Sequence, residues 1–262
     1  MDRIAKVFST GNKALVVYLT AGYPSIGLDE ELALTAIDAG ADILELGFPF
    51  SDPIADGPLI QEAAHQALNN GMTLAGTIDL AVRIRARRDT PIILMGYINP
   101  VHHMGYKTFA LSLAHAGGDG AIIPDLPMES ASALREEMRG QGLSLIPMAA
   151  PNTPPDRLNS LFGSGDGFLY LVSMAGLTGD AMDGTASWKN IAVKARKRGP
   201  LPVCIGFGIR TGKDAAEAAG TVDGVIVGSA ITQVIKEAGG QEKAKEGVKK
   251  LVGELAEAIK AV

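Results

Sequence analysis

The sequence has little of several features that define common classes of protein. It contains one cysteine, Cys204, which excludes a disulfide framework and a zinc site built from cysteines. Aromatic residues make up only 5% of the 262 residues, whereas glycine occurs 32 times. This composition favours helices packed closely on a parallel sheet over an aromatic-rich β-sandwich.

The chain also lacks an excess of positive charge and any long apolar run. Its net charge is −5 and its isoelectric point is near 5.4, which argues against a nucleic acid or an anionic membrane as partner. A phosphate ligand is still compatible, because backbone amides can bind it. No apolar run approaches the ~18 residues of a membrane span. Residues Met1–Ser9 lack the apolar core of a signal peptide, so we expect a cytoplasmic protein.

Short apolar runs alternate with longer amphipathic segments along the whole chain. The runs are nearly continuous rather than alternating, as is typical of parallel strands covered on both faces. The predicted strands are Ala14–Thr20, Ile43–Gly47, Pro91–Gly96, Gly120–Pro124, Leu143–Met148, Phe168–Ser173, Pro202–Gly206 and Gly224–Gly228.

Helical patterns lie between these runs, and eight strand–helix units are enough to close a barrel. The predicted fold is therefore α/β, a single (β/α)8 TIM barrel over residues 1–262. The alternative is a doubly wound open sheet, which often carries a dinucleotide fingerprint. The clearest predicted helices are Leu28–Ala39, Pro58–Arg85, Ser130–Gly142, Thr185–Arg198 and the closing Gln241–Val262.

Barrel enzymes build their active sites at the carboxyl ends of the strands, which directs attention to the loop after the second strand. Glu45 lies within an otherwise apolar strand. Burial there would raise the pKa of its carboxyl group, which suits a general acid or base near neutral pH. The alternative is a structural salt bridge to a neighbouring strand. Asp56 follows in a proline-rich loop and is the second candidate; alternatively, it caps the next helix, in which Pro58 takes an early position.

Two glycine motifs end the seventh and eighth strands, Gly206–Ile209 and Val227–Ala230. Glycine lets backbone amides approach an anion closely, and a helix starting near Ser229 would direct its positive end at it. Loops after these two strands bind phosphate in many barrels. The alternative is that the glycines only form tight turns. The loop after the sixth strand, Ser173–Gly179, is rich in small residues and is either a lid or an ordinary exposed loop.

Other chemistries have no support in the sequence. None of the four histidines has a partner at metal-ligand spacing, so no metal is expected. No lysine lies within a predicted strand, which argues against Schiff-base catalysis of an aldol cleavage. Acid–base chemistry on a phosphorylated substrate is the reaction type that remains.

The motifs in this order resemble those of the tryptophan synthase alpha subunit family over nearly the whole chain. The long loop after the second strand is the most specific, whereas other phosphate-binding barrels share the glycine motifs. The resembling segments are Leu19–Pro24, Glu45–Gln61, Tyr97–Pro100, Ser173–Gly179, Gly206–Ile209 and Gly228–Ser229.

The resemblance implies cleavage of indole-3-glycerol phosphate to indole and glyceraldehyde 3-phosphate. Glu45 matches the family's proton-shuttling glutamate, and Asp56 the aspartate that accepts the indole N–H. The alpha chain carries no cofactor in this family. The residues that match substrate-binding positions are Tyr18, Tyr97, Tyr170, Thr178, Gly179, Phe207, Gly208, Gly228 and Ser229.

The resemblance also implies an α2β2 complex with a pyridoxal-phosphate beta subunit, to which indole passes. Residues 49–53 and 97–100 would lie toward that partner. Two positions depart from common members: Met174 stands where some have arginine, and Tyr18 where phenylalanine is frequent. Alternatives are a free-standing indole-releasing lyase, a catalytically weak allosteric subunit, or a related barrel isomerase or indole-glycerol-phosphate synthase. The isomerase or synthase alternative would favour a catalytic lysine or cysteine at a strand end, and none is evident.

Overall fold

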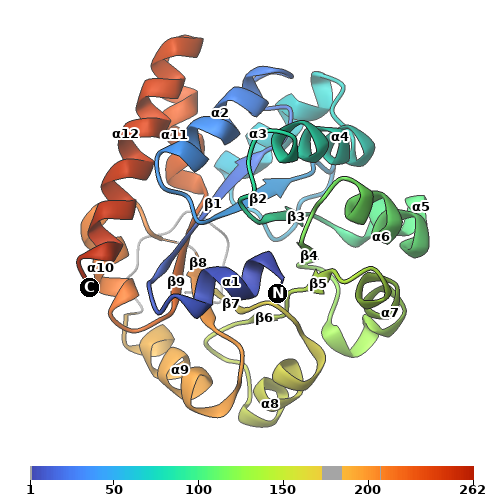
Figure 1. The fold of residues 1–262 in the computed structure, drawn as a ribbon, viewed down its shortest axis with the longest axis vertical. Helices are drawn as coiled ribbons and strands as arrows, with labels where there is room; N and C mark the ends of the chain where they lie inside the picture. The colour runs from blue at the N-terminus through green and yellow to red at the C-terminus, as the bar shows by residue number, and fades with distance from the viewer. Residues whose placement is uncertain (1, 173–184, 207) are drawn as a thin grey trace.

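The computed structural model describes residues 2–172, 185–206 and 208–262. Its strands form a closed ring surrounded by helices (Figure 1). The strands are β1 (Ala14–Thr20), β2 (Ile43–Gly47), β3 (Ile92–Met95), β4 (Gly120–Ile122), β5 (Ser144–Leu145), β6 (Met148–Ala149), β7 (Leu169–Val172), β8 (Val203–Gly206) and β9 (Gly224–Val227).

All neighbouring strands pair in parallel, in the order β5-β4-β3-β2-β1-β9-β8-β7-β6. β5 and β6 are the two halves of the single strand predicted over Leu143–Met148. They are separated by Ile146 and Pro147, and proline cannot donate a ladder hydrogen bond. The first half pairs with β4 and the second with β7, so this short segment closes the ring. The (β/α)8 barrel prediction is confirmed.

Helices cover the outside of the ring. One prediction is wrong: Pro58–Arg85 forms two helices rather than one. The break contains Gly71, whose φ of +84° lies in the left-handed region, and Thr73 then caps the second helix. The helices are α1 (Arg3–Ser9), α2 (Leu28–Asp38), α3 (Pro58–Asn69), α4 (Leu74–Arg85), α5 (Ile98–Met104), α6 (Tyr106–His115), the 3-10 helix η1 (Met128–Ser130), α7 (Ser132–Gly140), α8 (Pro155–Ser164), α9 (Thr185–Arg198), α10 (Gly212–Ala219), α11 (Ser229–Glu237) and α12 (Gln241–Lys260).

Two apolar layers hold the fold together. The larger one lies between the strands and the surrounding helices. The smaller one fills the barrel interior, where Val16, Ile43, Ile93 and Phe168 are buried. Because successive residues of a strand face opposite sides, the continuous apolar runs of the sequence supply both layers. None of the described helices is long and apolar enough to cross a membrane.

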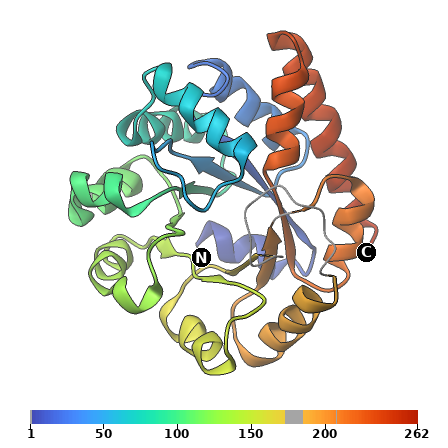
Figure 2. The same cartoon turned by 180° about the vertical axis from the view of Figure 1, so that it is seen from behind.

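Helix α1 lies across the end of the barrel at which the strands begin (Figure 1). Its Ile4 is fully buried, and the ring of Phe8 lies 5.9 Å from that of Phe168 inside the barrel. This end is therefore closed by packing. Figure 2 shows the opposite end of the molecule, where α1 lies behind the strands and the carboxyl ends of the strands face the viewer.

Candidate active site

A cavity lies at the carboxyl ends of β1, β2, β7, β8 and β9, and it gathers most of the predicted site residues. They come from segments far apart in the sequence and meet because parallel strands of a barrel all end at one face. The lining residues are Tyr18, Glu45, Asp56, Ile60, Met95, Tyr170, Gly208, Ile209, Arg210, Ile226, Gly228 and Ser229.

Glu45 is the fully buried carboxyl group that lines this cavity. It lies in the middle of β2, paired with Tyr18 of β1 and Ile93 of β3, and is 0% exposed. Among the described residues, neither of its carboxyl oxygens has a hydrogen-bond or salt-bridge partner. Burial, with a smaller contribution from the nearby charge of Asp56, raises the pKa of Glu45 to about 8. The salt-bridge alternative therefore finds no partner in the described part of the chain, and the carboxyl group is free to exchange a proton.

Asp56 follows β2 in the loop that leads to α3. Its Oδ2 accepts a hydrogen bond of 2.9 Å from the Tyr97 hydroxyl, whose oxygen in turn accepts one of 3.0 Å from the amide of Ala55. Burial raises the pKa of Asp56 to about 6, and the bond from Tyr97 opposes this rise. The helix-cap alternative is wrong, because Gly57 is the N-cap of α3 and no side chain bonds there.

The two carboxyl groups thus share one cavity but differ in their tendency to ionise. At neutral pH, a group with a pKa of about 8 is mainly protonated, and one with a pKa of about 6 is mainly ionised. Such a pair can supply a proton and stabilise a positive charge in the same site.

The other side of the cavity is formed by backbone. Gly228 and Ser229 lie where β9 passes into α11, and no side chain caps this helix. The first amides of an uncapped helix and its dipole attract an anion. Gly208, with a φ of +83°, lies beside them after β8. The helix predicted to start near Ser229 is confirmed.

Arg210 is a lining residue that the sequence analysis did not identify. It follows the glycine motif of β8, and its amide donates a hydrogen bond of 3.1 Å to Asp214 in the capping box of α10. The signal was available, since Arg210 is the first charged residue after that motif. Its positive charge adds to the anion-attracting side of the cavity.

Not every predicted residue can be placed. Thr178, Gly179 and Phe207 lie outside the described residues, as does the loop Ser173–Gly179. Tyr97 does not line the main cavity, but it reaches it indirectly through Asp56. The described part of the chain holds no cluster of histidine, cysteine or acidic side chains that could bind a metal ion.

The fold and this cavity define a class of protein, a (β/α)8 barrel enzyme with two buried carboxyl groups beside an uncapped helix terminus. Residues 4–260 match the family described as tryptophan synthase alpha chain. The tryptophan synthase alpha chain of Caulobacter vibrioides is 43% identical over 264 residues, covering 100% of this chain and 96% of that one. That of Carboxydothermus hydrogenoformans is 39% identical, with 100% of both chains covered.

Solved structures agree with these relatives. The alpha subunit of tryptophan synthase from Legionella pneumophila superposes with a TM-score of 0.92 at 35% identity, covering 100% of both chains. Tryptophan synthase from M. tuberculosis, in its aminoacrylate-bound form, gives a TM-score of 0.88 at 31% identity, with 99% of this chain and 100% of that chain covered. The chain belongs to the tryptophan synthase alpha chain family, which catalyses the indole-3-glycerol-phosphate lyase reaction.

Proposed function

We propose that this chain cleaves indole-3-glycerol phosphate by an acid–base retro-aldol reaction in which Glu45 moves the proton and Asp56 stabilises the indole ring. The observation that carries the proposal is the pair of buried carboxyl groups in one cavity, whose pKa values are raised to about 8 and about 6. Membership of the family supplies the substrate.

These two groups account for every proton transfer in the reaction. Protonated Glu45 donates its proton to C3 of the indole ring, and the positive charge that develops is shared with the ring N–H. Ionised Asp56 accepts that N–H and stabilises the charge. The Glu45 carboxylate then takes the proton of the glycerol hydroxyl next to C3, a C=O bond forms, and the electron pair of the breaking C–C bond returns to the ring. Indole and glyceraldehyde 3-phosphate leave, and Glu45 is protonated again.

The remaining site residues would hold the substrate. The backbone at Gly208, Gly228 and Ser229 faces the phosphate, and Tyr18 and Tyr170 line the wall beside the carboxyl pair. Family resemblance adds Thr178, Gly179 and Phe207 to this set. Tyr97 acts through Asp56, because its hydroxyl donates to that carboxyl group. No cofactor enters the proposed reaction.

We also propose that indole passes to a beta subunit docked at the carboxyl end of the barrel. The loop after β2 exposes Ile54, 73% of whose surface is accessible, next to the catalytic carboxyl Asp56. Phe50 of the same loop stacks on Tyr97, with ring centres 5.5 Å apart. A partner that covers this loop would therefore change the geometry of the Tyr97–Asp56 hydrogen bond. Docking would in this way directly affect the reaction.

Indole release from indole-3-glycerol phosphate, by the chain alone and with a beta subunit, tests the proposal. We expect slow release that rises strongly with the partner, and co-elution of the two chains in gel filtration. Fast release that the partner does not change would identify a free-standing lyase. No release in either condition would overturn the proposed reaction, and a partner rate that is unchanged by this chain would exclude the regulatory role.

A further inference from the structure

Tyr18 holds its hydroxyl group in a fixed position on the wall of the active-site cavity. Its oxygen lies 3.2 Å from Oγ1 of Thr20, two residues along β1 and on the same face of the strand. A methyl group added to Gly47 would lie 2.2 Å from this oxygen, and one added to Gly228 would lie 3.2 Å from the ring. Glycine at these two strand ends leaves the space that the Tyr18 side chain occupies.

This position places Tyr18 near Asp56, whose charge contributes to raising the pKa of the phenol. Tyr18 and Asp56 both line the main cavity, and both also line a second, smaller cavity under the loop after β2. The smaller cavity contains Thr20 and Tyr97 as well, and its volume is about 10 Å³. That is the lower limit for one water molecule. The polar side chains that line it carry three hydroxyl groups, each of which can donate one hydrogen bond, and the carboxylate of Asp56, which can accept several.

We propose that the Tyr18 hydroxyl is a positioning group for Asp56, to which it donates a hydrogen bond through one water molecule held in the smaller cavity. Thr20 donates to the Tyr18 oxygen, and Tyr18 passes its own proton toward the carboxylate. This chain mirrors the one on the other side, in which the Ala55 amide donates to Tyr97 and Tyr97 to Asp56. The inference rests on the proposed function and deepens it, because it gives the ionised carboxylate a second phenol donor.

The surroundings keep Tyr18 in its donating form. Burial, followed by the charges of Asp56 and Glu45, raises the pKa of the phenol well above its ordinary value. The titratable and charged side chains that line the two cavities around Asp56 come from five segments of the chain: Tyr18, Glu45, Tyr97, Tyr170 and Arg210. Of these side chains, Tyr18 and Tyr97 are the phenols that line the smaller cavity together with Asp56.

The test is the pH dependence of indole release by the Tyr18→Phe variant, which keeps the ring and removes the hydroxyl. Loss of a donor favours protonated Asp56, so the acidic limb of the profile should move to higher pH by about 0.5 unit. The variant should then lose about threefold in kcat at pH 5.5 and almost nothing at pH 7.5. Tyr106→Phe removes a hydroxyl on α6, away from both cavities, and should match the wild type at each pH.

Thr20→Val provides the second variant. It removes the donor behind Tyr18, so we expect a smaller shift of the acidic limb in the same direction, and no further shift when it is added to Tyr18→Phe. A loss that is the same at every pH, or an unchanged profile in both variants, overturns the inference while the wild type still releases indole. Absence of release by the wild type would instead overturn the proposed function. If Tyr18→Phe fails to fold, the profile of Thr20→Val decides.

Discussion

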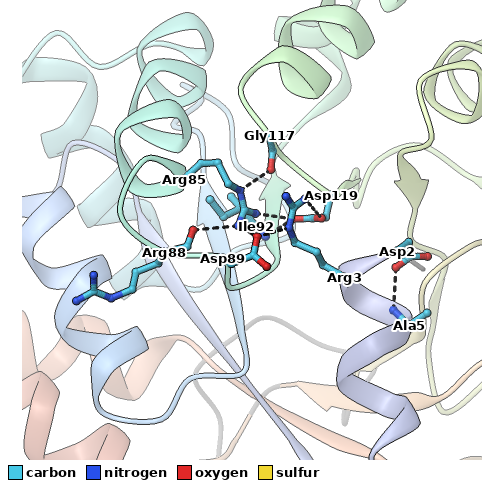
Figure 3. A network of polar contacts seen from close by, with 9 residues as sticks. All are labelled: Asp2, Arg3, Ala5, Arg85, Arg88, Asp89, Ile92, Gly117 and Asp119. Carbon is cyan, nitrogen blue, oxygen red and sulfur yellow. Dashed lines mark hydrogen bonds and ion pairs between the residues drawn. The ribbon is translucent and has the colours of Figure 1, made fainter.

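Two buried carboxyl groups, one at each end of the barrel, have opposite surroundings, with several hydrogen-bond partners for one and none described for the other. At the end where the strands begin, Asp119 is 8% exposed and accepts hydrogen bonds from Arg3, Arg85 and the amide of Ile92, at 3.0, 2.8 and 2.8 Å (Figure 3). At the other end, Glu45 is fully buried, and no described cation or donor contacts its carboxyl group.

The difference follows from what each carboxylate is surrounded by. Asp119 joins α1, α4, β3 and β4, and its charge is compensated by two guanidinium groups. Glu45 has apolar strand neighbours and a second carboxyl group near it, so its charged form is unfavourable. A paired carboxylate stabilises the fold, whereas one whose charged form is unfavourable can exchange a proton near neutral pH. The comparison predicts that changes at the two ends will separate activity from stability.

The largest effect should come from Glu45→Gln. This change removes the proton donor but keeps the shape, so indole release should fall by about a thousandfold, while the Km changes little. Steady-state assays of the purified variant measure both constants. Retention of more than a tenth of the wild-type kcat would contradict the assignment of Glu45.

The same variant should lose activity but gain stability relative to the wild type as the pH rises. The folded protein holds the Glu45 proton up to a pH of about 8, whereas the unfolded chain releases it near 4.5. The unfolded state therefore binds fewer protons in this window, and the wild type loses stability as pH rises through it. Glu45→Gln should remove this loss, so its thermal midpoint relative to the wild type should rise between pH 5.5 and 7.5. Differential scanning calorimetry at both pH values checks this.

The next largest effect is expected at the opposite end of the barrel. Asp119→Asn removes the less exposed of the two carboxylates that Arg3 and Arg85 share, the other being Asp89, and should lower the free energy of unfolding by about 3 kcal/mol. For a chain of this size, the melting temperature should fall by roughly 6 to 12 °C. The kcat of the folded fraction should stay within twofold of the wild type. A large loss of kcat at full folding would contradict the separation of the two ends.

A matched control for this change is Asp166→Asn. Asp166 pairs with Arg139 on the surface, where the two side chains are 30% and 47% exposed. Exposed pairs contribute little, so we expect a loss below about 1 kcal/mol. Equal losses in the two variants would show that burial does not distinguish the pairs.

Arg210→Ala should have a smaller effect, confined to substrate binding. Arg210 lines the cavity together with Ser229 at the uncapped start of α11, so the Km for indole-3-glycerol phosphate should rise about tenfold, with kcat nearly unchanged. Added salt should raise the Km of the wild type more than that of the variant. Arg157, on α8 outside this cavity, provides the control, and Arg157→Ala should leave the Km unchanged.

The smallest change concerns the shape of the pH profile. In the proposed mechanism Asp56 is ionised and Glu45 is protonated, so kcat should be highest between about pH 6 and 8, the pKa values to which burial raises the two groups. A profile that rises steadily from pH 5 to 9 would show that Glu45 does not act in its protonated form.

Much of this molecule could be predicted from the residues in order. The strands over Ala14–Thr20 and Ile43–Gly47 match the structure residue for residue, because continuous apolar runs of that length suit strands buried on both faces. Glu45 was identified because a carboxyl group inside an apolar run is costly unless it is used. The helix over Pro58–Arg85 was wrong because one glycine in a helical pattern does not reveal whether its φ is positive.

The sequence by itself determined the eight-unit barrel, the strand that carries Glu45, and the glycines at the start of α11. These features depend on local sequence patterns, each of which is contained within a single segment. Only the tertiary structure decided that Tyr97 bonds Asp56, that Tyr18 lines the same two cavities as Asp56, and that Arg210 lines the main one. Such contacts join residues dozens of positions apart. Their geometry, and the raised pKa values that follow from shared burial, come into existence only when the ring of strands closes.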